Sequence, residues 1–413
     1  MTSFLKTVVL LVVALLAAVA VAVVGFAAIR GITGSLIGVA GTAVSLGLCV
    51  AIAGGCVVMW REARRLRGGS DAFLEITGQR REPDLELPSG FRAGAIRRWL
   101  ARRIMRHDLL PGDAVRIRPL PEILATLDAH GALDGMPFQP EMMKFCGREA
   151  RVFRCLDKIY DYGRTKNMRR LDDCVLLSNL RCDGSAHGGC EATCYLIWKT
   201  EWLQHSEAAR TEVALPANVD VARVADAVAL GTGQGEVLRC QFTELHGCTT
   251  EYGSMSLGRD LIPLLCGNYS AKAWLIAMLT RIFNGVQSWR GGIRFPPLPP
   301  LGEHVTTDPT GLNVGERVAV LPLEQIARTL NSQGKNKGLW FDVEMVKHCG
   351  REYRVTARVQ KIIDDATGQM RLMKTPCIML DTVDSTGEGL HFNAQHDPIF
   401  WRESWLHRTD SPG

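Results

Sequence analysis

Residues Gly112 to Val152 read GDAVRIRPLPEILATLDAHGALDGMPFQPEMMKFCGREARV, and the chain contains this stretch twice. The second copy begins at Gly315 and reads GERVAVLPLEQIARTLNSQGKNKGLWFDVEMVKHCGREYRV. The offset of 203 residues holds without a gap as far as Leu203 and Leu406, and 28 of the 92 aligned pairs are identical. Self-similarity of this extent predicts two copies of one structural unit, called repeat 1 and repeat 2 below.

The unit has the pattern of a small β-rich fold. A Gly-Asp/Glu-x-Val turn leads into VRIR or VAVL, and a short helical stretch follows. The later runs ARVFRCLDKIYD, DDCVLLSNL and CYLIWKTEWL are rich in β-branched and aromatic residues and are separated by turns. This pattern predicts a small SH3-like β-barrel or roll with a helical insertion. The WxxxW ending is also compatible with a helix, because Trp198 and Trp202 would then share a face.

The first sixty residues differ in composition from the rest. Leu5–Ile29 and Ser35–Trp60 are apolar runs, and each can cross about 30 Å of hydrocarbon as a helix. A secretory signal peptide is the alternative for the first run, but a second apolar run follows at once. The arginines after Trp60 predict that this side is cytoplasmic. We therefore expect a transmembrane helical hairpin in the bacterial inner (cytoplasmic) membrane, with two spans and a cytoplasmic soluble part.

The expected fold class is thus α+β and β-rich, with the hairpin preceding the two homologous repeats. The expected domains are the hairpin at 1–62, a basic juxtamembrane segment at 63–110, repeat 1 at 111–204, a connecting helical subdomain with a Pro-rich linker at 205–302, and repeat 2 at 303–413. Residues 91–106 form a basic amphipathic helix in this prediction. The helix either lies on anionic lipid or packs on the soluble domain. Nucleic acid is not an expected partner, because no aromatic-interleaved basic surface follows.

The thirteen cysteines fall into two groups when the repeats are aligned. Cys146 pairs with Cys349, and Cys174 pairs with Cys377, so these cysteines are expected to be buried parts of the shared fold. The stretch RCDGSAHGGCEATC, residues 181 to 194, behaves differently. Its special residues face other residue types in repeat 2: Cys182 faces Ser385, His187 faces Leu390, Cys190 faces Asn393, Cys194 faces Asp397, and Cys155 outside the stretch faces Arg358. A fold that forms without these residues does not need them for packing, which indicates a separate role.

Thiolate and imidazole ligands suit zinc, and less well an iron–sulfur cluster. The expected zinc ligands are Cys182, Cys190 and Cys194, with His187 or Cys155 as the fourth. The spacing C-x7-C-x3-C matches neither zinc-finger knuckles nor common ferredoxin runs. A disulfide, a reactive thiol and no special role therefore stay open, although a reducing compartment argues against the disulfide. No nucleophile elbow, phosphate-binding loop or HExxH motif occurs in the sequence, so catalytic residues stay unknown.

RCDGSAHGGC followed by WKTEWL resembles an uncharacterised family of bacterial proteins. The likeness continues through RCQFTEL and CGNYSAKAWL to GLWFDVEM and FWRESWL, so it covers most of the soluble part. The family carries cysteines in its second copy at positions matching Ser385 and Asn393, and the present chain departs from that pattern. The resemblance implies a Cys182–Cys190 type site in repeat 1 alone. It implies no activity, and many relatives lack the hairpin.

Three functions fit these observations. The first is a membrane-anchored binding or scaffold protein with structural zinc in repeat 1. The second is a redox or metal-dependent enzyme that uses the repeat 1 cysteines. The third is a structural subunit of a larger membrane complex, with membrane lipid and other protein chains as partners.

Overall fold

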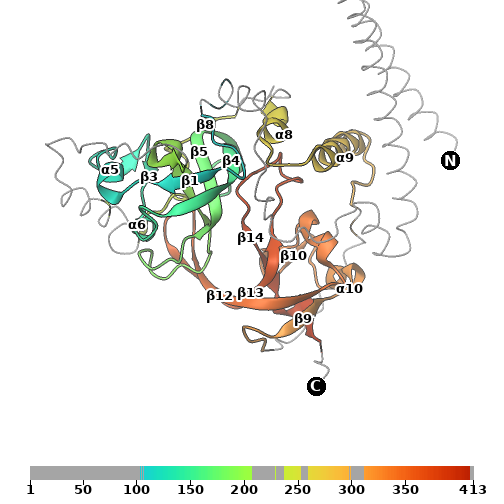
Figure 1. The fold of residues 1–413 in the computed structure, drawn as a ribbon. Coiled ribbons are helices and arrows are strands. Elements are labelled where there is room, and N and C mark those ends of the chain that lie inside the picture. Colours follow the sequence, from blue (N-terminus) through green and yellow to red (C-terminus); the bar gives the residue numbers. More distant parts are fainter. Residues whose placement is uncertain are drawn as a thin grey trace, which may run out of the picture. The chain divides into compact units, whose positions relative to one another are not determined.

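Two antiparallel sheets with the same strand order form most of the computed structural model (Figure 1). The structure describes residues 103, 105, 107–206, 228, 237–252, 259–296, 298 and 311–409. Both sheets belong to one compact unit of the chain, and residues 278–297 are grouped with a second unit.

Repeat 1 forms a sheet in the order β6-β5-β4-β1-β7. Its elements are β1 (Ala114–Ile117), α5 (Leu120–Leu124), β2 (Ala132–Leu133), β3 (Met136–Pro137), α6 (Pro140–Met143), β4 (Glu149–Asp161), β5 (Asn167–Arg181), β6 (Tyr195–Lys199), the 3-10 turn η2 (Thr200–Trp202) and β7 (Leu203–His205). The short β2–β3 ribbon stands apart from the large sheet. Pro119 precedes α5 and Pro140 begins α6, which suits proline because the first turn of a helix leaves its N–H groups unpaired.

Repeat 2 forms a sheet in the order β14-β13-β12-β9-β15. Its elements are β9 (Arg317–Val320), α10 (Leu323–Arg328), β10 (Lys335–Asn336), β11 (Leu339–Trp340), the 3-10 helix η4 (Val343–His348), β12 (Glu352–Ile363), β13 (Met370–Asp384), β14 (Pro398–Arg402), η5 (Glu403–Trp405) and β15 (Leu406–Arg408). Strands β1 and β9 each begin at the same place in the sequence alignment, and so do β6 and β14. The two repeats therefore share strand order as well as sequence.

Two tryptophans anchor the core of each repeat. Trp198 and Trp202 are fully buried in repeat 1, as Trp401 and Trp405 are in repeat 2. Phe138 meets Trp202 edge-on with ring centroids 5.3 Å apart, and Phe341 meets Trp405 at 5.4 Å. The WxxxW ending is therefore a strand followed by a 3-10 turn.

The cysteines that the repeats share lie in or beside these cores. Cys174 and Cys377 are buried, as the sequence predicted, and Cys349 is buried as well. Cys146 is only half-buried and packs on the repeat 1 core from one side. Its thiol donates a long hydrogen bond of 3.8 Å to the Met142 carbonyl.

The connecting segment adds one short strand to the repeat 1 sheet. It contributes β8 (Thr250–Glu251), η3 (Arg259–Leu261), α8 (Ile262–Cys266) and α9 (Ala271–Trp289), and β8 pairs with β5. The Lys158 ammonium is fully buried and donates to Asp260 Oδ1 at 3.0 Å. Helix α9, with 19 residues, is the longest described helix of the connecting segment.

The predicted fold class and localisation need correction. Among the described residues, no helix combines the length and the apolar character needed to cross a membrane. Helix α9 has 19 residues, but it carries Lys272, Arg281 and Asn284. The hairpin predicted for residues 1–62, with its two inner-membrane spans and cytoplasmic soluble part, lies outside the described residues and is not supported.

The SH3-like barrel is corrected as well. The described residues form a β-rich α+β fold with several sheets and few helices. In repeat 1 the outer strands β6 and β7 stand at opposite ends of the sheet order, and β14 and β15 do so in repeat 2. Among the described strands these outer pairs do not hydrogen-bond to each other, so backbone pairing does not close a barrel.

Asp157 on β4 is expected to make stability depend on pH. Both of its carboxylate oxygens are buried without a hydrogen-bond partner among the described residues. Burial raises its pKa to about 6, against the pull of Lys158. Above pH 6 the folded protein therefore holds a poorly solvated charge, whereas below about pH 4 the carboxyl is neutral in both the folded and unfolded states.

Replacing Asp157→Asn should therefore stabilise the protein at pH 7.5 by about 2–3 kcal/mol, because a pKa difference of about two units corresponds to that free energy. The gain should shrink steadily as the pH falls from 6 to 4. Urea unfolding of both proteins across this range measures the effect. An equal gain at pH 4 and pH 7.5 would refute the ionisation argument.

Candidate metal centre

The cysteine-rich loop of repeat 1 joins β5 to β6. Its ends are tied together where the Cys182 N–H donates to the Cys194 carbonyl at 2.8 Å. Inside the loop, the Gly184 carbonyl accepts from the N–H groups of His187 and Gly189, both at 2.9 Å. Gly184 has a φ of +69°, and a Cβ there would lie 2.0 Å from the Cys190 carbonyl oxygen. Only glycine fits this position, so the loop is tightly folded around its centre.

A carboxylate from outside the loop holds it in place. Glu141 lies on α6, and its Oε1 accepts from the Ala186 N–H at 2.9 Å and contacts His187 Nδ1 at 2.6 Å. His187 is 1% exposed and Glu141 is 3% exposed. The other carboxylate oxygen of Glu141, Oε2, is buried and has no hydrogen-bond partner within the described part of the chain. A buried carboxylate oxygen without a partner is costly, which makes this oxygen a candidate ligand atom for a cation.

Cys182 completes a three-residue group with these two side chains. One ligand atom each from Glu141, Cys182 and His187 lies within 4.8 Å of the other two. Oxygen, sulfur and nitrogen donors of this kind are the ligands that zinc and similar ions take in proteins. The buried group could therefore hold a metal ion.

The remaining partner of the histidine is Gln139, whose Nε2 lies 3.2 Å from His187 Nε2. With Nδ1 turned to Glu141, the Nε2 side of the ring faces this amide. The Gln139 amide therefore holds the Nε2 side of the ring, and Nδ1 is the nitrogen that faces Glu141 and could act as the ligand atom.

Burial and neighbouring groups shift the pKa values of Glu141 and Cys182. Burial alone would raise the pKa of Glu141, but the hydrogen bond and charge of His187 and the Ala186 N–H leave that pKa below its ordinary value. Burial, reinforced by the charge of Glu141, raises the pKa of Cys182 to about 12. A free thiol in this position is therefore neutral at pH 7, which is the opposite of an activated cysteine nucleophile.

Repeat 2 has the equivalent loop, with Ser385 and Leu390 at the positions of Cys182 and His187. Glu344, the counterpart of Glu141, accepts from the Ser385 hydroxyl at 2.9 Å and from the Thr386 N–H at 2.8 Å. Its other oxygen accepts from the Gly389 N–H at 3.3 Å. Ser385 stands where repeat 1 has Cys182. Both oxygens of Glu344 are thus satisfied by the loop itself, whereas Glu141 keeps one oxygen without a partner among the described residues.

The structure brings together two of the five residues predicted from the sequence, Cys182 and His187. Cys190 points to repeat 2, where its sulfur accepts from the Ile363 N–H at 3.4 Å. Cys194 packs against the repeat 1 core. Cys155 lies in a separate buried cluster with Met105, Leu110, Ile262 and Cys266, and its thiol donates to the Leu109 carbonyl at 3.3 Å.

Sequence reasoning missed Glu141. One signal was available, because Glu141 is identical to Glu344 in the repeat alignment. However, a residue that is identical in both repeats is interpreted as part of the shared fold rather than as a metal ligand. The structure gives this glutamate both roles, since it organises the loop in each repeat and faces the thiol and imidazole in one.

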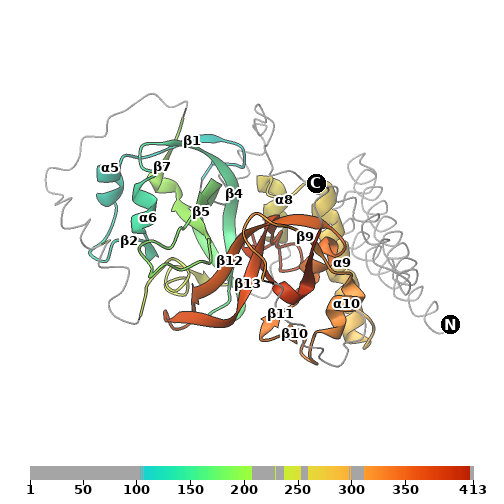
Figure 2. The same cartoon turned by 90° about the horizontal axis from the view of Figure 1, so that it is seen from below.

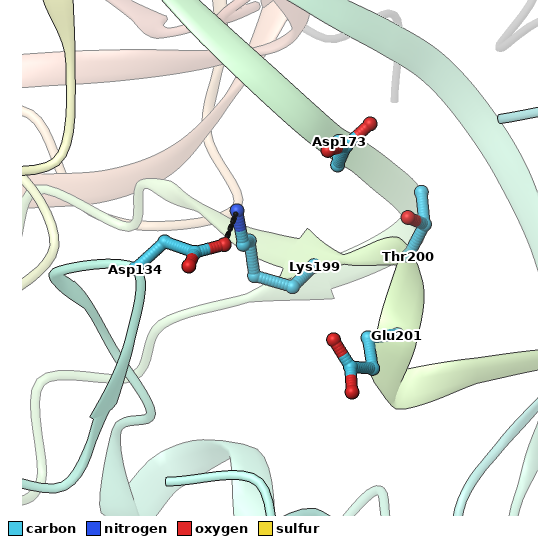
Figure 3. Close-up of a pocket in the computed structure, with 5 residues that line it drawn as sticks. All are labelled: Asp134, Asp173, Lys199, Thr200 and Glu201. Carbon is cyan, nitrogen blue, oxygen red and sulfur yellow. Dashed lines mark ion pairs between the residues drawn. The ribbon is translucent and has the colours of Figure 1, made fainter. Parts of the chain in front are cut away.

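A polar pocket of about 280 Å³ lies elsewhere on repeat 1. It is lined by Asp134, Asp173, Lys199, Thr200 and Glu201 (Figure 3). Figure 3 shows Lys199 reaching toward Asp134, and their charged groups are 2.8 Å apart. Arg402 takes the place of Lys199 in repeat 2, where it donates to the carbonyls of Asn336 and Lys337. The shared task of this cation is to fasten the ribbon turn to the sheet, so we assign the pocket no ligand.

A scan against protein-family models and a search of curated proteins found no match to this chain. The resemblance to an uncharacterised bacterial family therefore stays a prediction.

Proposed function

We propose that this chain is a binding or scaffold protein in which a zinc ion, held by Glu141, Cys182 and His187, fixes the cysteine-rich loop of repeat 1. The Oε2 of Glu141 carries the proposal, because it is buried without a partner among the described residues, on a carboxylate that is grouped with a thiol and an imidazole. Zinc accepts this mixture of oxygen, sulfur and nitrogen donors. An iron–sulfur cluster fits less well, because clusters are held mainly by several thiolates and the group contains one.

A structural role agrees best with the burial of the group. Substrate would have to reach ligands that are 1% and 3% exposed. The second candidate is a metal-dependent enzyme, and the observation in its favour is the number of ligands. Three protein ligands leave a tetrahedral ion with one open position, as in catalytic zinc sites. The third hypothesis from the sequence, a subunit of a membrane complex, depended on the predicted hairpin and is not carried further.

Metal analysis of the full chain tests the proposal. We expect about one zinc ion per chain, with loss of the metal in Glu141→Gln. Glu344→Gln is the matched control, because it changes the same residue at the same place in repeat 2 and should keep the zinc. Circular dichroism of both variants confirms that they are folded. A wild-type chain that takes up no zinc, or a coloured sample that contains iron, contradicts the proposal.

A further inference from the structure

The loop that carries His187 is also held by repeat 2. Glu191 Oε2 accepts from the backbone N–H groups of Gln360 at 2.5 Å and Lys361 at 3.2 Å. The Glu191 N–H donates in turn to the Lys361 carbonyl at 3.0 Å. The pairing of β12 with β13 is irregular between Val359 and Lys361. This irregularity coincides with the backbone groups that the loop of repeat 1 uses.

Two further contacts lie next to the histidine. The Lys361 ammonium donates to the Gly188 carbonyl at 2.9 Å. The Ile363 N–H donates to Cys190 Sγ at 3.4 Å. The loop residues that form these contacts with β12 are therefore one to four positions after His187. The far end of the β12–β13 hairpin lies beside repeat 1 in both views (Figures 1 and 2).

The repeats use the same lysine in opposite ways. Lys158 is the counterpart of Lys361, and it is buried in repeat 1 against Asp260 of the connecting segment. Lys361 is instead free to reach across to the Gly188 carbonyl. Repeat 2 therefore supplies a lysine and a run of N–H groups, and the repeat 1 loop supplies a carboxylate and a carbonyl. Most donors of this contact belong to repeat 2, and most acceptors belong to the loop of repeat 1.

We propose that metal bound at Glu141, Cys182 and His187 controls the docking of strand β12 onto residues 188–191, so that the loop is a metal-dependent latch between the repeats. The inference rests on the proposed function. The metal fixes His187, and His187 sets the position of the segment that follows it. Without the metal, residues 188–191 must lose conformational entropy when they form their hydrogen bonds to repeat 2, so docking is less favourable. Repeat 2 closes its own loop with Ser385 and Glu344, so its loop needs no metal.

Hydrogen exchange of the full chain, with zinc and after chelation, measures the latch directly. We expect residues 183–194 and 358–363 to lose protection together when the metal is removed. Strands β9 and β15, which pair with each other on the other side of repeat 2, should not change. If chelation makes exchange faster in 183–194 but leaves it unchanged in 358–363, the latch is refuted, while the metal site is still supported. Absence of bound zinc in the untreated chain would overturn the proposed function itself.

Thermodynamic reciprocity gives a second test. If the metal strengthens the latch, the latch must strengthen metal binding by the same factor. Glu191→Ala and Lys361→Met should therefore still bind zinc, but with affinity lower by on the order of tenfold. Glu201→Ala, at an exposed glutamate ten positions further along, is the matched control. Unchanged zinc affinity in both latch variants would refute the coupling.

Discussion

Zinc binding is expected to disappear when Cys182→Ser and His187→Leu are combined. These are the residues that repeat 2 has at 385 and 390. The double variant removes the sulfur and nitrogen donors. Changes to residues that merely support metal ligands already cost about 10–100-fold in affinity. Losing two ligands should therefore weaken zinc binding by more than about 100-fold.

The metal-free protein should nevertheless stay folded. The hydroxyl that Cys182→Ser introduces can donate to Glu141 Oε2, as Ser385 donates to Glu344 at 2.9 Å. That hydrogen bond would satisfy an oxygen that now lacks a partner among the described residues. We expect the free energy of unfolding of the metal-free double variant to lie within about 1 kcal/mol of that of the metal-free wild type.

Competition with a chromophoric chelator measures the affinity, and urea unfolding after chelation measures the stability. Cys146→Ser is a suitable control, because this half-buried thiol lies outside the three-residue group and should leave zinc binding unchanged. Wild-type affinity in the double variant would show that zinc is bound somewhere else on the chain.

The sequence located the loop of the site better than the residues within it. Clustering of Cys182, His187, Cys190 and Cys194 within fourteen residues predicted a common site, but nearness in sequence does not fix direction. The turn at Gly184 and the left-handed glycines after His187 send Cys190 toward repeat 2. Glu141 comes from a helix more than forty residues earlier. Only the tertiary fold brings its carboxylate to the loop.

The alignment of the two repeats was informative about the core rather than about the site. The two repeats pack the same fold, so residues that are identical in both are those that the shared core requires. Trp198, Trp202 and Cys174 were separated in this way from the cysteines of the loop, and all three are buried. The alignment also explains why Glu141 was missed. Glu141 and Glu344 are identical, so the alignment assigned both to the shared fold, although Glu141 has an additional role in repeat 1.

Composition was a poorer guide to the structure than the internal repeat. The apolar runs at 1–62 predicted a membrane hairpin, which lies outside the described residues, and no described helix is long and apolar enough to cross a membrane.

The largest effects on stability are expected at the tryptophan pair of each repeat. Trp198 and Trp202 are both fully buried, so replacing either by alanine should cost about 3–5 kcal/mol. Their indole nitrogens differ, however. Trp202 Nε1 donates to the Thr126 hydroxyl at 3.0 Å. Trp198 Nε1 is buried without a partner among the described residues.

Phenylalanine substitutions should separate packing from hydrogen bonding at these two positions. Trp198→Phe removes an indole N–H that has no hydrogen-bond partner among the described residues, whereas Trp202→Phe removes a donor to the Thr126 hydroxyl. We expect Trp202→Phe to lower the free energy of unfolding by about 1 kcal/mol more than Trp198→Phe. Repeat 2 provides an internal duplicate, because Trp405 Nε1 donates to Thr329 at 2.8 Å and Trp401 Nε1 lacks a partner in the described residues. Urea unfolding of the four single variants should give the same order in both repeats. Equal costs within each pair would mean that ring volume alone sets the contribution of these tryptophans.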